Sequence, residues 1–407
     1  MVTKSIYRNS SCLVVLTILF LLSVMPSSAK TVTYVKEYTY QASEVDSKLS
    51  CRTIALEQVK RLLLEELGTH LISETVVKDF ELTKDQVSSF TASVVMAVIL
   101  EEKWDGKTYF LKAKITTDTD ELVKSIDKIR RNQEQSTTWE EVGKKTEEAL
   151  KEIEKLKKEM GKGGGEKVSQ EKYERAVNEL NAIDWFKKGH ALRYSAKGYV
   201  LSYSAKNEQE AMKAYDKAIE LDPNYAIAYA GRAAIYMESG QYFKALGQSE
   251  QAIKLDPNLA WGFNCRGYAN TGLMKYPEAI QDFKKALELS PKYIWAYCNR
   301  SWTYFMLKDY QKALEDANKA IELDPEFSTA YFRRGRALAS LNNFQDAVKS
   351  YDKAIKLDPT FSWSFLHRGY SFLELGKTEQ ALEDLKNAAN LGNNEAQNYL
   401  KRKGIRW

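Results

Sequence analysis

Small residues recur every 34 positions through the C-terminal half of the chain, and this spacing predicts repeated pairs of helices. Alanine occupies one such position at Ala211, Ala245, Ala279, Ala313, Ala347 and Ala381. A second alanine follows seven residues later, at Ala218, Ala252, Ala286, Ala320, Ala354 and Ala388. Proline closes five of the units, at Pro223, Pro257, Pro291, Pro325 and Pro359. Because proline ends a helix and alanine lets two helices approach closely, each unit is expected to be a helix–turn–helix.

The units resemble the tetratricopeptide (TPR) repeat, whose period is also 34 residues. The segments YDKAIELDPN at 215–224 and YDKAIKLDPT at 351–360 carry this resemblance, which covers about residues 181–403. A third small residue of the family pattern, on the first helix of each unit, is found here as Ala233, Gly267, Ser301, Gly335 and Gly369. The resemblance implies an all-α superhelix, an α-solenoid, in which each repeat buries its apolar face against the next.

The 34-residue spacing also predicts where the repeats begin and end. An N-terminal helix and an atypical first repeat are expected at 168–225, followed by repeats at 226–259, 260–293, 294–327, 328–361 and 362–393. About ten extra residues, from Arg193 to Tyr203, either lengthen the first helix of the first repeat or form a loop. Asn393 stands where the last repeat would have proline, and residues 394–407 are expected to form a polar capping helix.

In the TPR family the first helices line the concave surface, and the resemblance implies a binding face at the same positions here. The candidate binding residues are Trp261, Asn264, Tyr268, Trp295, Trp302, Phe305, Phe332, Arg336, Trp363 and Tyr370. Four tryptophans on one surface offer flat contact area for a partner helix or an extended peptide. The same rings could stack on sugars, or could pack between repeats. The lysine, asparagine and arginine set with which some relatives hold a C-terminal carboxylate is not matched.

Arginine shares the 34-residue period, at Arg232, Arg266, Arg300, Arg334 and Arg368. One interpretation is a ladder of charges for acidic partners. The favoured interpretation is structural, because that position in the family faces a neighbouring helix and ties the array together through ion pairs and stem packing.

Alternating β-branched and aromatic residues at the start of the N-terminal region predict a strand at TVTYVKEYTYQA, residues 31–42. A helix capped by Ser43 and Asp46 is expected over 43–70, then a strand at 72–80 and a short helix whose cap is formed by residues 83–86. Two further strands flank the Asp105-Gly106 turn, and a helix starts at Thr119. Residues 30–132 therefore form a predicted α+β domain. It resembles the N-terminal domain of flagellar assembly protein T and small envelope lipoproteins, which implies envelope association.

A seven-residue apolar spacing predicts a helical connector at 133–160, between the α+β domain and the superhelix. Its first and fourth places are Trp139, Val142, Thr146, Ala149, Ile153, Leu156 and Met160. Such a helix could self-associate as a coiled coil, or could serve as a solvated spacer. The run GKGGGEK at 161–167 is expected to be a linker.

The first residues have the pattern of a secretory signal peptide. Lys4 and Arg8 precede an apolar run from Cys12 to Met25, which is too short to cross a bilayer, and Ser27 and Ala29 suit cleavage after residue 29. Retention of the run as an anchor is the alternative. The expected location is therefore extracytoplasmic, in the periplasm or outside the cell.

Charge and histidine placement exclude several classes of function. Removing Lys4 and Arg8 takes the formal net charge from +5 to 5 − 2 = +3, too small for a nucleic-acid footprint. The three histidines, His70, His190 and His367, lie in separate regions without a metal-binding, nucleophile or nucleotide motif. We therefore expect no catalytic residues, no metal and no cofactor. The sequence predicts an exported scaffold for a protein or peptide partner, with glycan or peptidoglycan binding as the alternative.

Overall fold

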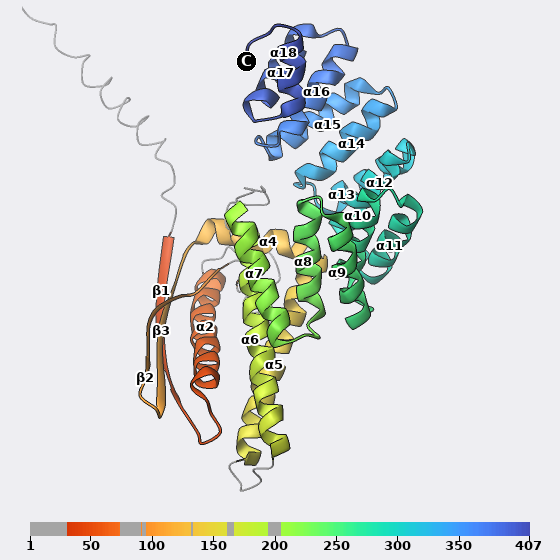
Figure 1. Cartoon of the computed structure of the whole chain (residues 1–407). Coiled ribbons are helices and arrows are strands. Elements are labelled where there is room, and N and C mark those ends of the chain that lie inside the picture. Colours follow the sequence, from red (N-terminus) through yellow and green to blue (C-terminus); the bar gives the residue numbers. More distant parts are fainter. Residues whose placement is uncertain (1–30, 74–90, 92–94, 132, 161–166, 194–204) are drawn as a thin grey trace, which may run out of the picture.

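The structure is a computed structural model that describes residues 31–73, 91, 95–131, 133–160, 167–193 and 205–407 (Figure 1). The predicted signal peptide, the predicted helix cap at 83–86, and the linker up to residue 166 lie outside the described residues. So do residues 194–203 of the extra segment in the first repeat. Within the described ranges, no helix is both long enough and apolar enough for a membrane span.

The N-terminal unit is an antiparallel three-stranded sheet covered on one face by a long helix (Figure 1). Its strands are β1 (Thr31–Gln41), β2 (Val98–Trp104) and β3 (Thr108–Asp118), in the order β1-β3-β2. The covering helix is α2 (Lys48–Ser73), and α4 (Thr119–Arg131) follows the sheet. At the hairpin tip, Asp105 Oδ1 accepts the N–H groups of Lys107 and Thr108, at 2.8 and 2.6 Å, while Gly106 has φ +93°. The α+β fold class, the first strand and the hairpin are thus confirmed.

Helix α2 starts and ends later than the sequence predicted. Ser47 and Ser50 form the cap, since the Ser50 N–H donates to Ser47 Oγ at 3.1 Å and the Ser47 N–H donates to Ser50 Oγ at 2.9 Å. Asp46 precedes the cap and contacts it, because Ser50 Oγ donates to Asp46 Oδ1 at 3.3 Å, while Asp46 Oδ2 accepts the N–H of Ser43 in the preceding turn. The predicted strand at 72–80 is wrong at its start. Its first two residues extend α2, continuing the buried stripe that ends in Leu71.

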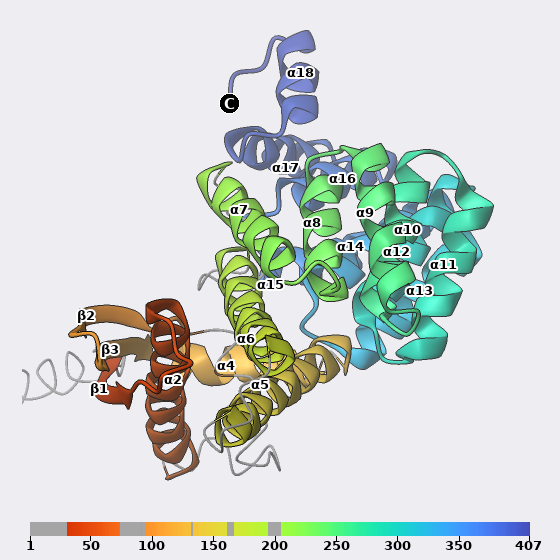
Figure 2. The same ribbon diagram turned by 60° about the horizontal axis from the view of Figure 1, so that its bottom comes forward.

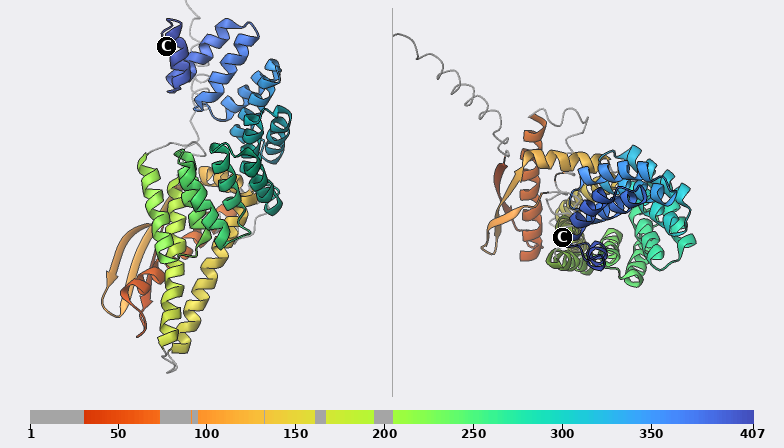
Figure 3. Two further views of the ribbon diagram at one scale, coloured as in Figure 1. Left: turned by 45° about the vertical axis from the view of Figure 1, so that its right-hand side comes forward. Right: turned by 90° about the horizontal axis from the view of Figure 1, so that it is seen from above.

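The predicted connector is one arm of a helical hairpin and not an isolated spacer. Helix α5 (Gln133–Met160) packs along α6 (Lys167–Arg193), and the hairpin stands beside the sheet-containing unit (Figure 3). All seven residues of the predicted coiled-coil stripe are only 2–7% exposed. Six of them, all except Thr146, belong to one buried hydrophobic cluster that runs from Tyr40 to Cys265. The stripe predicted for self-association is therefore occupied within the chain, because α6 supplies the partner helix.

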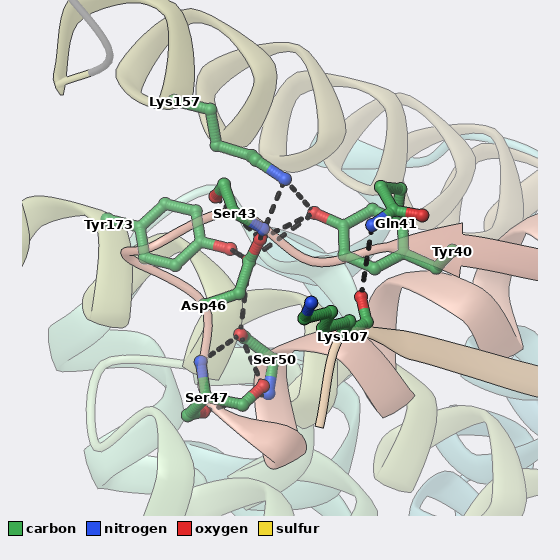
Figure 4. Close-up of polar contacts among 9 residues, drawn as sticks. All are labelled: Tyr40, Gln41, Ser43, Asp46, Ser47, Ser50, Lys107, Lys157 and Tyr173. Carbon is green, nitrogen blue, oxygen red and sulfur yellow. Dashed lines mark hydrogen bonds and ion pairs between the residues drawn. The ribbon is translucent and has the colours of Figure 1, made fainter. Parts of the chain in front are cut away.

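A buried carboxylate joins the N-terminal unit to this hairpin (Figure 4). The side chain of Asp46 is 0% exposed, and Lys157 of α5 donates to it at 2.8 Å. Tyr173 of α6 donates to the same carboxylate, as does Tyr40 of β1. Burial opposes ionisation of Asp46, but the hydrogen bonds from Lys157 and Tyr173 outweigh it and hold the pKa of Asp46 below its usual value. Residues from three elements are thus fixed around one negative charge.

The remaining helices form antiparallel pairs that follow a curved, superhelical path (Figure 2). Helix α6 pairs with α7 (Ala205–Leu221), and the array ends in the single helix α18 (Asn394–Arg402). Between them lie α8 (Ala226–Glu238) with α9 (Tyr242–Leu255), α10 (Ala260–Gly272) with α11 (Tyr276–Leu289), α12 (Ile294–Met306) with α13 (Tyr310–Leu323), α14 (Ser328–Ser340) with α15 (Phe344–Leu357), and α16 (Ser362–Glu374) with α17 (Thr378–Asn390). The α-solenoid fold is confirmed, although α6 begins well before the family pattern requires.

The two helices of a pair fit through matched side-chain sizes. A Cβ atom on Gly335 would lie 2.6 Å from the ring of Tyr351, and one on Gly267 would lie 2.9 Å from Phe283. Where the first helix carries the larger Ala233 or Ser301, the residue sixteen places later is small. The five pairs are Ala233 with Ser249, Gly267 with Phe283, Ser301 with Ala317, Gly335 with Tyr351, and Gly369 with Leu385. Each contact is therefore filled by one bulky or two small side chains, as close packing requires.

The periodic arginines bind acidic residues of this chain, which supports their structural interpretation. Arg266, Arg300 and Arg368 each pair with the aspartate sixteen residues later, at 2.6–2.7 Å. Arg368 also reaches Asp352 in the preceding repeat at 2.6 Å. Arg334 meets a serine instead, because Ser350 occupies the aspartate position and its Oγ accepts from Nε at 3.0 Å.

Placing an aspartate at position 350, as in the other repeats that form this ion pair, should stabilise the array. We expect Ser350→Asp to raise the free energy of unfolding by about 1 kcal/mol, since a charge-assisted pair replaces a neutral hydrogen bond. Thermal denaturation of the single variant and of Ser350→Asp combined with Arg334→Met measures the effect. If Ser350→Asp changed the melting temperature equally with Arg334 present and with Arg334→Met, no ion pair with Arg334 would have formed.

Candidate functional site

The first helices of successive pairs line the inner face of the superhelix. Helices α8, α10, α12, α14 and α16 pack against one another more extensively than the second helices α9, α11, α13, α15 and α17 do. The first helices therefore lie at the smaller radius of curvature, as Figure 2 shows. We call the surface of these five helices the inner face. All ten binding residues predicted from the sequence lie on these helices.

Three of the ten predicted binding residues are buried and cannot offer contact area. Trp261 is 7% exposed because its ring packs edge-on against His190 of α6. Asn264 is 4% exposed, and its Oδ1 accepts from Asn299 of the next repeat at 3.1 Å. Phe332 is 4% exposed and packs edge-on against Phe361 at 5.0 Å. For these three, the alternative of packing between repeats is the correct one.

Most of the other predicted residues are partly exposed but engaged with neighbours. Trp295 packs edge-on against Phe327 at 4.8 Å, and the Tyr268 ring lies 6.4 Å from that of Tyr242. The Tyr370 hydroxyl donates to Glu395 at 3.0 Å. Trp363 differs from them, because it is 43% exposed. These residues are distributed along the whole inner face and do not converge on one point.

The remaining three predicted residues meet in one place, together with an arginine that the sequence analysis missed. The rings of Trp302 and Phe305 are stacked, with centroids 5.4 Å apart and planes at 10°. The Arg336 guanidinium lies 4.2 Å from the Phe305 centroid and 4.7 Å from that of Trp302. Arg333 also lies 4.7 Å from the Trp302 centroid. We call these four residues the aromatic–arginine cluster.

Arg333 was missed because it falls between the periodic positions used to choose inner-face residues. It is the first arginine of the run Arg333-Arg334-Gly335-Arg336 in α14. The sequence signal was therefore present, since three arginines within four residues exceed what the periodic ion pair needs. Only the structure shows that Arg334 turns to Ser350 while Arg333 and Arg336 turn to Trp302.

The charges of the cluster are poorly solvated. Burial lowers the pKa of Arg336 to about 10, and Arg333 adds to the effect through like-charge repulsion. Burial also lowers the pKa of Arg333, whose Nε is buried without a hydrogen-bond partner among the described residues. In Arg300, by contrast, the hydrogen bond to Asp316 outweighs burial and raises the pKa. The cluster thus combines two partly buried cations with a flat aromatic surface.

Family models match the C-terminal region at several places. A tetratricopeptide repeat model matches residues 294–327 and 328–361, a second model described as TPR repeat matches 203–240 and 275–307, and a third matches 350–383. The C-terminal half of this chain contains tetratricopeptide repeats. No curated protein sequence matches the chain.

Several solved structures with tetratricopeptide repeats are similar to this region. One is YrrB, described as a TPR protein with an unusual peptide-binding site: 24% identity, 47% of this chain and 99% of that one covered, TM-score 0.35. Another is MamA, with 22% identity, 42% and 94% covered, and TM-score 0.34. MamA from Desulfovibrio magneticus RS-1 has 22% identity, 41% and 94% covered, and TM-score 0.36.

The last tetratricopeptide repeat and the capping helix enclose a hollow of about 530 Å³. Its lining residues are Ser362, Trp363, Gly392, Asn393, Asn394, Glu395, Asn398 and Arg402. Asn393 is occupied as the cap of α18, because its Oδ1 accepts the Ala396 N–H at 3.0 Å. The remaining amides and the exposed Trp363 ring offer hydrogen bonds and a flat surface in the same hollow.

The described residues contain no group of three or more histidine, cysteine, aspartate or glutamate side chains placed to hold a metal ion. Within the described chain, Cys51, Cys265 and Cys298 are buried and form no disulfide, and the Cys265 thiol donates to the Ala230 carbonyl oxygen at 3.7 Å. Burial raises the pKa of the Cys298 thiol to about 12, which keeps it protonated.

Two histidines, the buried His190 and the partly buried His367, should make the protein sensitive to acid. Burial lowers the pKa of His190 and of His367 from 6.5 to about 3, with nearby arginines adding to the effect. Since both are neutral in the folded state, their contribution is complete above pH 6.5 and is lost as the pH falls toward 3. Within this pH range, each histidine should lower the free energy of unfolding by up to about 1.4 kcal/mol for every pH unit of acidification.

Melting temperatures measured between pH 7.5 and 4.5 check this acid sensitivity. We expect His367→Gln to reduce the slope of stability against pH by the equivalent of about one proton taken up on unfolding, because the glutamine side chain does not titrate. The exposed Lys349→Gln is the control. An unchanged slope in His367→Gln would contradict the assignment of a neutral imidazole.

Proposed function

We propose that this protein is an exported scaffold that holds a peptide or helix of a partner protein on its inner face, within the cell envelope. The tetratricopeptide repeats support the general role, because stacked repeats of this kind create an extended concave surface for protein interaction. The aromatic–arginine cluster is the observation that carries the proposal, since aromatic and arginine side chains are the residues most often found at binding hot spots.

The proposed contact is centred on Trp302 and Phe305. Stacked rings lose little conformational freedom on binding and present a large flat area to a partner side chain. The export part rests on the sequence of residues 1–29, and the envelope part also on the resemblance of the N-terminal domain to flagellar assembly protein T. YrrB, described as having a peptide-binding site, is consistent with a peptide as the bound element.

Affinity capture from an envelope extract tests the inner-face proposal. The bait is the full chain without residues 1–29, compared with its Trp302→Ala and Trp363→Ala variants. We expect a stoichiometric protein band whose binding weakens more than threefold in Trp302→Ala. Phe243→Ala is the matched control, because Phe243 is a 78% exposed aromatic on the second helix α9. Equal binding by Trp302→Ala and Phe243→Ala would contradict the proposal.

Glycan binding is the second candidate function, and the hollow at Trp363 is the observation that favours it. A flat indole beside amide, carboxylate and guanidinium groups suits the alternating apolar and hydroxyl faces of a sugar. Retention of the protein on insoluble peptidoglycan, lost in Trp363→Ala, would support this function. A captured protein band that survives glycosidase treatment supports protein binding instead.

Export is tested separately from binding. Expression of the full chain in a bacterium, followed by cell fractionation and mass spectrometry of the N-terminus, should recover a chain that begins at Lys30 outside the cytoplasm. Recovery of uncleaved chain from the cytoplasm would contradict export without touching the inner-face proposal.

A further inference from the structure

Two inner-face arginines, Arg333 and Arg336, carry positive charge without a carboxylate of the described residues at ion-pair distance. The periodic arginines Arg266, Arg300 and Arg368 are each paired with aspartate at 2.6–2.7 Å. Among the ion pairs of the described residues, none includes Arg333 or Arg336. Charged side chains taken out of water are almost always paired, because desolvation of an unpaired charge is costly. The two guanidinium groups are therefore unusual within this chain.

The surroundings of the two arginines do not compensate for the missing partner. Tyr268 and Cys298 are the polar neighbours that act on Arg333, and both are neutral near pH 7 because burial raises their pKa values. Glu395 is the acidic residue that acts on Arg336 from a distance, and its carboxylate already accepts from Tyr370. What remains is contact with the faces of Trp302 and Phe305.

We propose that Arg333 and Arg336 bind an acidic side chain, aspartate or glutamate, carried on an otherwise apolar segment of a partner protein. This inference rests on the proposed function and specifies the chemistry of the partner. A carboxylate fits because a guanidinium can donate two parallel hydrogen bonds to it. The flanking residues would be apolar, because Trp302 and Phe305 form the surface next to the two cations. Charge complementarity is thus the feature that selects the occupant.

The residues of the inner face favour an internal acidic side chain over a C-terminal carboxylate as the group that is bound. The asparagine and lysine residues with which some relatives hold a chain terminus are not present at the corresponding inner-face positions, which carry Ala234, Tyr268, Trp302 and Tyr370 around Arg336. Arg333 and Arg336 lie three residues apart on α14, beside rings of α12. Both can therefore reach one acidic side chain of a segment that crosses α12 and α14.

Selection from a random 12-residue peptide library tests this inference. The library is displayed on phage with its C-terminus fused to the coat protein, so no peptide offers a free terminal carboxylate. Panning on the full chain without residues 1–29 should enrich peptides with aspartate or glutamate beside aromatic or aliphatic residues. Synthetic copies of these peptides should bind at least tenfold more weakly to Arg336→Gln, and so should their asparagine or glutamine versions to the unmodified protein.

The outcomes separate this inference from the proposed function. Enriched peptides that depend on Trp302 but carry no acidic residue would overturn the arginine assignment and leave the inner-face proposal standing. Absence of any peptide whose binding depends on Trp302 would overturn both. Binding of a polyuronate that is lost in Arg336→Gln, with no peptide selected, would assign the site to an acidic glycan instead. Arg406→Gln, a substitution of an exposed arginine that follows α18 and does not line the hollow, is the control.

A stability comparison tests the same inference without a ligand. If Arg336 serves binding and does not stabilise the fold, Arg336→Met should leave the melting temperature unchanged or raise it, because a partly buried unpaired charge is removed. Arg300→Met should lower the melting temperature, because Asp316 is left without its partner. A fall in Arg336→Met as large as that in Arg300→Met would show a structural role for Arg336 and overturn the inference.

Discussion

Substitution of Asp46 by alanine should lower the free energy of unfolding of the N-terminal unit by about 3–5 kcal/mol. The change removes the carboxylate and leaves Lys157 as a charge that is only 21% exposed and has lost its acidic partner. It also removes the acceptor for Tyr40 and Tyr173, so groups from β1, α5 and α6 lose their common partner (Figure 4). Hydrogen exchange of the α2 and α5 amides in the intact protein measures the loss.

The control for Asp46 is a carboxylate outside any such network. Glu315 is an exposed residue of α13, and Glu315→Ala should change the free energy of unfolding by less than about 0.5 kcal/mol. Asp46→Asn should lie between the two variants, because the amide keeps one acceptor but loses the charge. Equal exchange protection in Asp46→Ala and Glu315→Ala would show that the joint between the sheet and the hairpin does not depend on Asp46.

Substitution of Gly335 by leucine should destabilise the fifth repeat by about 3 kcal/mol, at the upper end of overpacking effects. Its Cβ alone would lie 2.6 Å from the ring of Tyr351, which is fully buried and has no space into which to move. The helices α14 and α15 would have to separate, and the inner face at Arg336 would be displaced with them. The midpoint of urea unfolding is the measurement.

Gly247 provides the matched control for this prediction. It lies within α9 in open space, since a Cβ added there would meet nothing within 4 Å. Gly247→Leu should therefore stabilise the helix by about 0.5–1 kcal/mol, because glycine is a poor helix former. The same substitution should thus have opposite signs at two glycines. A destabilisation of similar size at both positions would contradict the size-matched packing of the repeats.

The array of helices could be predicted from the sequence because each repeat is defined by local spacing. Proline, alanine and glycine act within one or two turns of their own helix. Their 34-residue period therefore identifies the repeats even when the rest of the fold is unknown. The β2–β3 hairpin was predictable for the same reason, since Asp105 and Gly106 determine the turn by themselves. The α2 cap was misplaced by four residues because Ser43 and Asp46 have the same spacing as Ser47 and Ser50, the pair that forms the cap.

Contacts between distant segments could not be predicted. The heptad stripe of α5 is covered by α6, which starts seven residues later. A spacing pattern does not say whether an apolar stripe packs on another copy or on a later helix of the same chain. Exposure on the inner face was equally undetermined. Trp261 and Trp363 occupy the same place in their repeats, yet only Trp363 is exposed, because His190 of α6 covers Trp261. The convergence of Arg333 with Trp302 likewise depends on packing between repeats.

Photo-crosslinking at the inner face tests the central claim most directly. A benzoylphenylalanine residue replaces Thr329, on the inner helix α14, or Lys319, an exposed residue of the outer helix α13, in the full chain produced in its native cells. If the inner face holds a partner protein, irradiation should give a discrete crosslinked protein for the Thr329 position, and that product should be absent for Lys319 and lost on Trp302→Ala. A partner captured at Lys319 and not at Thr329 would contradict the account.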